Sequence, residues 1–281
     1  MKLRLPKIRT ILYSVVGLFA AFYLLGVIML ATDDRVVEPL AEGAGKPLAI
    51  AIFGASGTAG DGILEATLES DDIASIQLVT RRITPRMEAG VQAGKVVIHQ
   101  HMDYLDYSAV IDSLADVDAV YWAIGISSLG VDEETYGRIH VDFPVAFVTG
   151  WEAVATQPDR SFHYISSSDI SEESSAMLAR EKVRAEKALF ALGKESDLRV
   201  VAYRPDYIGP TEEEAHIGQD MLFAFFAPVG AAVRARQIGQ SMIEVTQRGD
   251  EFANGAKIGT RRIVLYSDAY EARLPNNRNG R

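Results

Sequence analysis

Apolar residues along this chain follow two periods, and the alternation of the two predicts an α/β fold. Short runs that are apolar almost throughout predict six strands, at residues 48–53, 76–80, 96–99, 119–124, 162–166 and 198–203. Apolar positions three or four residues apart predict helices at residues 58–68, 136–148 and 172–192, with Gly193 ending the last one. Strands without a polar face are typical of parallel sheets that helices cover on both sides. The pattern therefore predicts a doubly wound parallel sheet, with a small C-terminal lobe from about residue 209.

The longest apolar run, residues 11–31, contains no charged side chain. At about 1.5 Å per residue, a helix of that length is roughly 30 Å long, which matches the hydrocarbon core of a bilayer. A cleaved signal peptide has a shorter apolar core, of about 7–15 residues, and a small-residue cleavage site. We therefore expect a single-pass membrane protein with a basic N-terminus at 1–10 and a transmembrane helix at 11–31. A tether at 32–46 then leads to one soluble domain at 47–281.

Three glycines lie between the first predicted strand and the first predicted helix of that domain, in the sequence A-I-F-G-A-S-G-T-A-G. Gly54 permits a tight turn, Gly57 lets the backbone approach a pyrophosphate, and Gly60 lets helix and strand pack closely. The helix N-terminus adds unpaired N–H groups and the positive end of a dipole. The pyrophosphate is expected to lie against Gly54, Ala55, Ser56, Gly57, Thr58, Ala59 and Gly60. The strand and helix around the loop indicate a Rossmann domain that binds a nicotinamide dinucleotide.

The spacing G-x-x-G-x-x-G resembles the short-chain dehydrogenase/reductase superfamily. The resemblance is to its extended and atypical branches, including the NmrA-like NAD(P)H-binding proteins, and it runs from about residue 48 to about residue 210. T-R-R after the second strand and Y-R-P-D-Y-I-G-P at 203–210 agree with it. The resemblance implies that Asp103 lies near the adenine. It also implies that the turn formed by Ala123, Ile124 and Gly125 lies beside the cofactor.

Arg81 and Arg82 bear on the choice between the two nicotinamide dinucleotides. In this branch of the superfamily an arginine after the second strand often contacts the adenosine 2′-phosphate. Guanidinium groups offer forked donors that suit a phosphate, whereas an NAD site would have an acidic side chain there for the ribose diol. NADP(H) is therefore favoured over NAD(H). The alternative is that both arginines are a solvated strand end.

Enzymes of this superfamily use a serine, a tyrosine and a lysine, the last two in the motif Y-x-x-x-K. The resemblance places Ser167 or Ser168 at the serine position, and it places Lys182 at the lysine position, where it would also hold the nicotinamide ribose. Four residues before Lys182, however, stands Leu178, and no tyrosine of the chain has a lysine four residues after it. A leucine cannot exchange a proton, so the usual acid/base is missing.

Three functions remain open on these residues. The domain is a cofactor-dependent sensor or scaffold, or an NADPH-dependent oxidoreductase for a small or lipophilic carbonyl compound with another proton donor, or an epimerase-type enzyme. For the second, the candidate donors are Tyr164, Tyr207, His140 and His163. Loss of a general acid/base typically removes about 10²–10⁴-fold in rate but leaves cofactor binding intact, so the first function is favoured.

Composition and charge remove several other classes of function. The net charge of −10 argues against a nucleic-acid surface, which needs clustered lysine and arginine. The chain has no cysteine, which excludes disulfides, Cys-ligated zinc, iron–sulfur clusters and thiol nucleophiles. We expect no metal site. Protein partners and the oligomeric state are not indicated by the sequence.

The two ends of the predicted membrane helix differ in charge. Basic residues precede it, and Asp33 and Asp34 follow it, so the positive-inside rule predicts a cytoplasmic N-terminus and a domain on the other side. Nicotinamide dinucleotides, however, are made and recycled in the cytosol. The sequence therefore leaves the side of the membrane open.

The C-terminal part contains a second apolar segment, at residues 221–233. It is too short to span a bilayer, so we expect the core of the C-terminal lobe, with a substrate-pocket wall or a membrane-surface patch as the alternative. The acidic run at residues 212–214 before it predicts a helix N-terminus.

Overall fold

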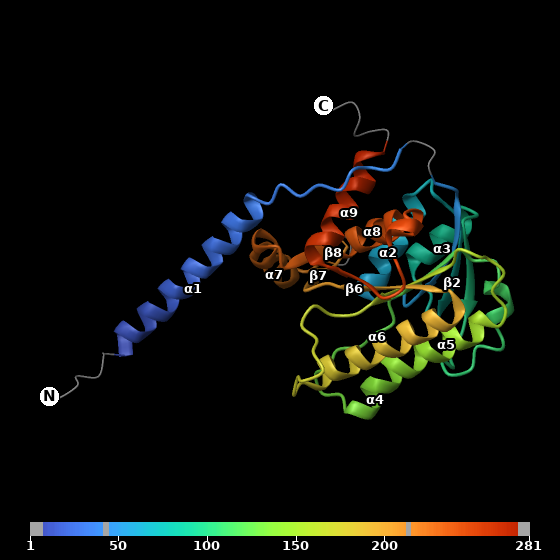
Figure 1. Ribbon diagram of the computed structural model, residues 1–281, viewed down its shortest axis with the longest axis horizontal. Coiled ribbons are helices and arrows are strands. Elements are labelled where there is room, and N and C mark those ends of the chain that lie inside the picture. The colour runs from blue at the N-terminus through green and yellow to red at the C-terminus, as the bar shows by residue number, and fades with distance from the viewer. Residues whose placement is uncertain (1–7, 42–44, 212–214, 275–281) are drawn as a thin grey trace.

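A computed structural model describes residues 8–41, 45–211 and 215–274, and a seven-stranded sheet organises them (Figure 1). The strand order is β3-β2-β1-β4-β5-β6-β9, and every neighbouring pair is parallel. The strands are β1 (Leu48–Phe53), β2 (Ile73–Thr80), β3 (Val96–Gln100), β4 (Ala119–Trp122), β5 (Ser161–Ile165), β6 (Arg199–Arg204) and β9 (Ala256–Gly259). The predicted doubly wound sheet is thereby confirmed. The strand order reverses between β1 and β4, which is where sheets of this type bind ligands.

Helices cover both faces of the sheet and enclose two separate cores (Figure 1). One face carries α2 (Thr58–Glu69), α3 (Pro85–Gln92), α8 (Ala235–Gln247) and α9 (Thr260–Ala272), and the other carries α4 (Glu133–Gly137), α5 (Phe143–Glu152) and α6 (Met177–Ser196). Alternate residues of β1 serve the two cores: Ile50 and Ile52 face the first, Ala51 and Phe53 the second. All four are fully buried, which explains why the strand is apolar without interruption.

The helix predicted at 136–148 extends from Glu133 to Glu152, with a π-helical turn at Arg138–Asp142 between α4 and α5. Pro144 has no N–H group to donate to the carbonyl four residues earlier, that of His140. That carbonyl instead accepts a hydrogen bond from the Tyr164 hydroxyl at 3.1 Å. The proline thus frees a backbone acceptor, and the acceptor ties this helix to β5.

Helix α6 differs from its predicted bounds at both ends. It begins at Met177 rather than residue 172, and it continues through Gly193 to Ser196, where Asp197 adopts the left-handed conformation with φ 56°. The prediction that Gly193 ends the helix is wrong. A Cβ at that position would lie 2.6 Å from the Leu198 carbonyl oxygen, so the glycine serves the close approach of helix and strand.

The C-terminal part of the chain adds the last strand to the sheet and a helix that lies outside the body. Strand β9 pairs with β6, and α8 packs closely against α2. A second, two-stranded sheet of β7 (Tyr207–Gly209) and β8 (Ala232–Arg234) packs against the first core through Ile208 and Val233. Helix α7 (Ile217–Phe226) lies between these strands in the sequence and projects from the body. No residue of α7 is buried, so the expectation that this segment forms core is wrong for the helix. The acidic run at 212–214 lies outside the described residues.

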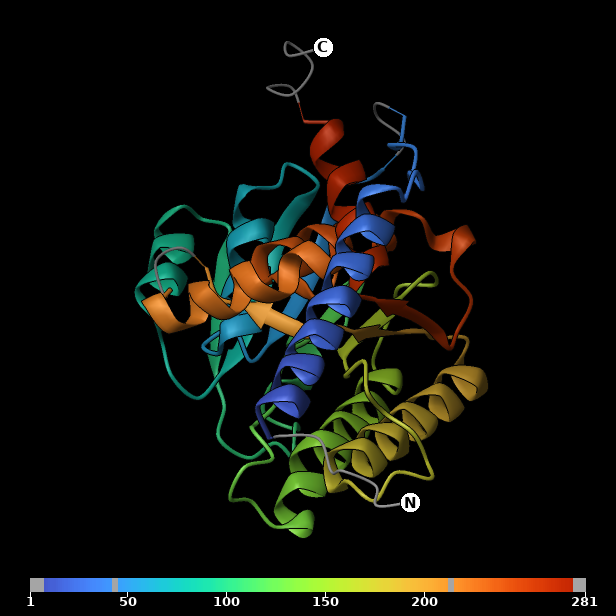
Figure 2. The ribbon, with the colours of Figure 1, turned by 90° about the vertical axis from the view of Figure 1, so that its left-hand side faces the viewer.

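Helix α1 (Ile8–Ala31) projects from the body beside α7 (Figures 1 and 2). Its segment Leu12–Ala31 has the length and hydropathy of a membrane-spanning helix, and none of it is buried. The chain after α1 lies against α9, where the Asp33 carboxylate accepts a bond from the Arg261 Nε at 2.7 Å. The segment expected as a tether is therefore bound to the domain along part of its length.

Substitution of two helical glycines, Gly62 in a crowded place and Gly150 in an open one, tests the packing of α2 against α8. A Cβ on Gly62 would overlap the Ala235 backbone, whereas a Cβ on Gly150 of α5 would lie 3.8 Å from its nearest neighbour. Because alanine is the better helix former by about 1 kcal/mol, Gly150→Ala should stabilise the protein by up to about that amount. Gly62→Ala should instead destabilise it by about 1–3 kcal/mol. Chemical denaturation of the full chain in detergent measures both, and equal effects would contradict the assigned packing.

Candidate functional site

The turn between β1 and α2 is built around its glycines. Gly54 has φ 81°, and a Cβ there would lie 2.6 Å from the carbonyl carbon of Ala123 on the neighbouring strand's exit. A Cβ on Gly60 would overlap the Gly54 carbonyl oxygen. A Cβ on Gly57 would have the Gly54 carbonyl oxygen as its nearest neighbour, at 3.5 Å, which is an ordinary contact distance. Packing thus requires glycine at positions 54 and 60, whereas Gly57 leaves the outer side of the turn open.

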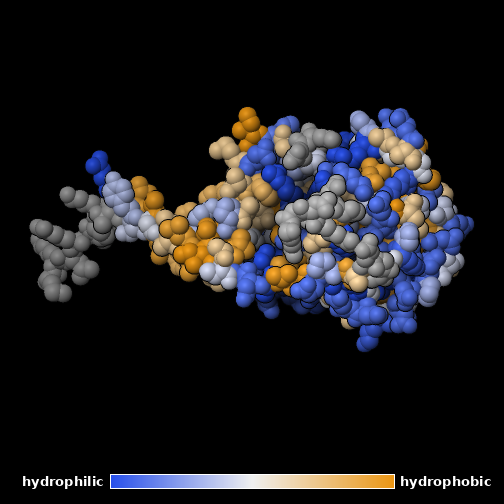
Figure 3. All heavy atoms as spheres, turned by 90° about the horizontal axis from the view of Figure 1, so that it is seen from above, coloured by the Kyte–Doolittle hydropathy of each residue, from blue (hydrophilic) through white to orange (hydrophobic). Residues whose placement is uncertain are grey.

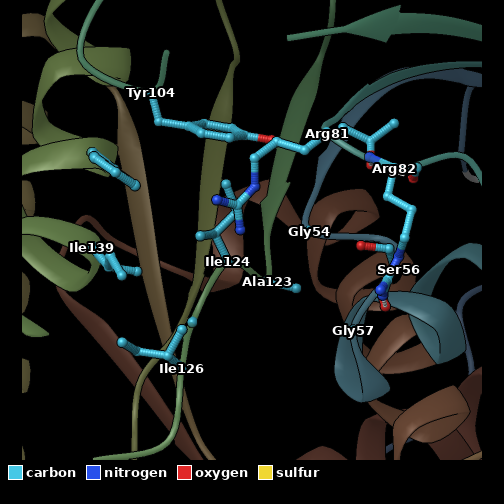
Figure 4. Close-up of a pocket in the computed structure, with 13 residues that line it drawn as sticks. Gly54, Ser56, Gly57, Arg81, Arg82, Tyr104, Ala123, Ile124, Ile126 and Ile139 are labelled. Carbon is cyan, nitrogen blue, oxygen red and sulfur yellow. Dashed lines mark hydrogen bonds between the residues drawn. The ribbon is translucent and has the colours of Figure 1, made fainter. Parts of the chain in front are cut away.

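The turn opens into a pocket of about 260 Å³ at the carboxyl ends of β1, β2 and β4 (Figure 4). Eight of the residues expected at a cofactor line it together: Gly54, Ser56, Gly57, Arg81, Arg82, Ala123, Ile124 and Gly125. Pockets that bury a whole drug-sized ligand measure about 300–1,000 Å³, so this one accommodates part of a dinucleotide. The remaining loop residues, Ala55, Thr58, Ala59 and Gly60, belong to the turn and the first turn of α2 but do not line the pocket.

The two arginines approach the pocket differently (Figure 4). Arg82 reaches the glycine loop, where its Nη2 donates a hydrogen bond to the Ser56 carbonyl oxygen at 3.0 Å. The guanidinium carbon of Arg81 lies 5.7 Å from the centre of the Tyr104 ring. No aspartate or glutamate is among the residues that line this pocket. Its charge is therefore positive, which favours a phosphate.

Five lining residues were not expected from the sequence: Thr80, Tyr104, Ile126, Ile139 and Phe143. Tyr104 follows Asp103 directly, and an aromatic side chain next to the acid expected at the adenine is the feature of the sequence that could have predicted this lining residue. Burial raises the pKa of Tyr104. Asp103 itself is exposed and outside the lining, and its carboxylate accepts a bond from the Leu105 N–H at 3.0 Å. Ile139 and Phe143 lie on the helix that the π turn interrupts.

Lys182 lies outside this lining, almost fully buried between α6 and β5. Its Nζ donates to the Ile165 carbonyl oxygen at 2.8 Å and to the Tyr164 hydroxyl at 3.2 Å. Burial lowers the pKa of Lys182 to about 7, against a smaller opposing effect of Glu186. Two protein oxygens thus accept hydrogen bonds from the amine.

The other residues expected at the catalytic position do not line the pocket either. Ser167 is half-buried, and Ser168 is exposed with its N–H bonded to the Pro205 carbonyl at 3.2 Å. Leu178 is the second residue of α6 and is half-buried. The serines and Leu178 thus lie at the carboxyl edge of the sheet, apart from the glycine-loop pocket.

The alternative proton donors are mostly enclosed by protein. Tyr164 and His163 are fully buried, and burial raises the pKa of Tyr164 and lowers that of His163. His140 is almost fully buried, and burial together with the Lys182 charge lowers its pKa to about 3. Tyr207 is half-buried, and its hydroxyl donates to the Gln219 carbonyl at 3.3 Å. At neutral pH, His140 and His163 are uncharged and Tyr164 retains its proton.

Several solved structures superpose on this chain. A short-chain dehydrogenase/reductase from Serratia marcescens superposes with a TM-score of 0.60 at 16% identity, over 76% of this chain and 96% of that one. BdcA in complex with NADPH gives 0.57 at 16% identity, over 77% and 94%. UDP-glucuronic acid 4-epimerase from Bacillus cereus in complex with NAD gives 0.57 at 14% identity, over 75% and 76%. The chain has the fold of the short-chain dehydrogenase/reductases and NAD-dependent epimerases, as the sequence resemblance implies.

Among curated proteins, the chain is similar to the mitochondrial protein fmp52 of Aspergillus fumigatus. The two are 26% identical over 189 residues, which is 66% of this chain and 77% of that protein. No protein-family model matches the chain. The distant similarity fits the extended branch of the superfamily that the glycine spacing indicates.

The buried amine of Lys182 should make stability depend on pH. Its pKa is about 7 in the folded chain against an ordinary 10.5, so between these values the unfolded chain binds a proton that the folded chain does not. Folding stability should therefore rise with pH across that window, by up to about 1.4 kcal/mol per pH unit. Lys182→Met should lose this rise, and the exposed Lys194→Met should retain it. Denaturation of the full chain between pH 7 and pH 9 measures the difference, and identical profiles for the two variants would contradict the assignment.

Proposed function

We propose that this chain is a membrane-anchored NAD(P)(H)-binding protein of the short-chain dehydrogenase/reductase type that acts as a cofactor-dependent sensor or scaffold. One observation supports the proposal: residues expected at the cofactor line one pocket, whereas Ser167, Ser168 and Lys182, expected at the catalytic position, do not line it. The glycine loop and both arginines line one pocket. Lys182 is instead bound to Ile165 and Tyr164, four residues after a leucine.

The pocket suits the adenosine and pyrophosphate part of a dinucleotide. The open side of Gly57 and the N-terminus of α2 offer N–H groups and a positive dipole end to a pyrophosphate. Tyr104 offers an aromatic ring and Arg81 a flat guanidinium group over that ring, both suited to adenosine. The NADPH and NAD complexes of the two similar folds support the same class of ligand. When bound, the dinucleotide would supply hydride chemistry.

We further propose that NADP(H) is preferred to NAD(H). Arg81 and Arg82 both follow β2 at the rim of the pocket, where the adenosine ribose lies in Rossmann domains. No carboxylate among the lining residues is available for the ribose diol. A 2′-phosphate would be met by two guanidinium groups, whereas an unmodified ribose would find no carboxylate among the lining residues.

The membrane anchor of this proposal is the segment Leu12–Ala31 of α1. Its large apolar side chains are exposed, with Phe22 and Met29 about two-thirds exposed, and exposing such a surface to water is unfavourable. A hydrocarbon environment satisfies them.

Binding and turnover separate the sensor from the oxidoreductase or epimerase alternative. We expect the full chain in detergent to bind NADPH and to oxidise it with none of a panel of small carbonyls and quinones. Gly57→Asp places a carboxylate at the N-cap of α2, facing the pyrophosphate, and should abolish NADPH binding without unfolding the domain. Gly259→Asp changes the N-cap glycine of α9 in the same way and should bind normally. Native affinity in the Gly57 variant would contradict the loop assignment, and turnover that requires Gly57 would establish the enzyme.

Replacing both arginines tests the cofactor preference. The variant Arg81→Gln with Arg82→Gln should lose more affinity for NADPH than for NADH, by roughly tenfold or more, because each charge-assisted bond to a phosphate contributes about 1.5–3 kcal/mol. The control Lys187→Gln with Lys194→Gln removes two charges from α6 and should change neither affinity. Fluorescence titration of both dinucleotides gives the ratio, and equal losses would reject the phosphate role.

A further inference from the structure

Helix α7 exposes a stripe of large apolar side chains. Ile217, Met221 and Phe225 recur every four residues, and Leu222 lies beside them. All four are exposed, Met221 by 69% of its surface. Residues four apart lie on one face of a helix, so the stripe is one continuous surface. Soluble proteins rarely leave such a surface open to water.

The C-terminal end of this stripe contacts α1 (Figure 2). The rings of Phe19 and Phe225 stack at 6.2 Å with an angle of 2° between them, and Tyr23 stacks on Phe225 at 5.2 Å. The Tyr23 hydroxyl donates a hydrogen bond to the Phe225 carbonyl oxygen at 2.9 Å. A Cβ on Gly26 would lie 3.1 Å from Val229, so the glycine lets the two segments approach closely.

The depth of these contacts follows from the geometry of α1. Tyr23 lies eight residues before Ala31, which is about 12 Å along a helix axis. If α1 crosses a bilayer with Ala31 at its surface, Tyr23 is near the middle of a hydrocarbon core about 30 Å thick. A hydroxyl at that depth needs a partner, and its partner is the Phe225 carbonyl. Phe225 therefore lies at the same depth as Tyr23.

Three contacts attach the other face of α7 to the domain. Asp220 forms an ion pair with Arg234 of β8 at 3.3 Å. The Arg234 guanidinium also lies over the Phe223 ring, 3.8 Å from its centre. The Tyr207 hydroxyl binds the Gln219 carbonyl. These contacts fix the face of the helix that carries Asp220 and Phe223 to β8 and leave the apolar stripe outward, on the side of α1. Figure 3 shows the hydrophobic surface of α1 extending to the adjoining part of the body.

We propose that α7 is a second membrane-contacting element, inserted into the lipid leaflet next to the domain, with its apolar stripe against acyl chains. The proposal rests on the proposed anchoring through α1. A lipid occupant is favoured over a second copy or another protein because α7 contacts α1 at the depth of acyl chains. A protein that covered the stripe would have to enter the bilayer as well.

The insertion sets which side of the domain faces the membrane. Strand β7 follows β6 after two residues, so α7 lies at the carboxyl edge of the sheet. The glycine-loop pocket opens at the same edge. A ligand that reaches this edge beside the cofactor would therefore come from the lipid phase or from its interface, which defines a lipophilic class.

The absence of cysteine makes the proposal testable with single labels on the full chain. Met221→Cys and Met102→Cys replace methionines of equal exposure, 69% and 70%, one on α7 and one after β3. Leu24→Cys labels α1. Each variant carries a bimane in nanodiscs of phosphatidylcholine, with and without bromine on the acyl chains. Bromine should quench the label at Met221 as strongly as at Leu24, and it should leave the label at Met102 unchanged. A charged maleimide should react roughly tenfold or more slowly at Met221 than at Met102, since charges do not enter hydrocarbon.

The outcomes separate this proposal from the anchor on which it rests. Quenching at Leu24 but not at Met221, with fast maleimide labelling at Met221, overturns the insertion of α7 and leaves the anchor standing. Quenching at neither position overturns both. Slow labelling at Met221 without bromine quenching shows a protein covering α7, which also overturns the proposal. Because all three side chains are exposed, thermal unfolding should match that of the parent chain.

Discussion

The structure depends on one close approach, that of the β1–α2 turn to the end of β4. Gly54 leaves β1 in a left-handed conformation, with only 2.6 Å between its would-be Cβ and the Ala123 carbonyl carbon. Gly60 then lets α2 begin directly over that turn. These two contacts point the helix N-terminus into the gap between β1 and β4. The pocket is lined there by residues after β1 and β4, and residues at the ends of β2 and β3 close it on one side.

The approach of α2 to the sheet also explains the role of the C-terminal residues. Gly62 and Gly239 let α2 and α8 come into backbone contact, and α8 in turn supports α9 and strand β9. Ile238 and Met242 belong to the same core as Ile50 of the first strand. The C-terminal region is thus partly an outer layer of the Rossmann sheet. The small two-stranded sheet reaches the same core through Ile208 and Val233, and α7 has no buried residue.

The sequence predicts those elements well whose pattern has one physical cause. Strands β1 and β4 are uninterrupted in apolar character because both faces are buried, and the glycine loop follows from steric need at Gly54 and Gly60. The π turn near His140 and the extension of α6 past Gly193 depend on contacts with β5 and Leu198, which are distant in sequence or set by tertiary packing. The same limit applies to the site. The turn after β3 directs Tyr104 into the pocket and Asp103 away from it, and the sequence does not show this direction.

Lys182 shows why a matched motif residue need not imply a reaction. A lysine amine that is almost fully buried requires acceptors, and the Ile165 carbonyl and the Tyr164 hydroxyl provide them. These bonds join α6 to β5, and Tyr164 continues the connection to the freed His140 carbonyl in the π turn. Packing alone thus gives the lysine a structural role that is independent of any tyrosine at position 178. The presence of Lys182 therefore supports the fold of a reductase and does not by itself support turnover.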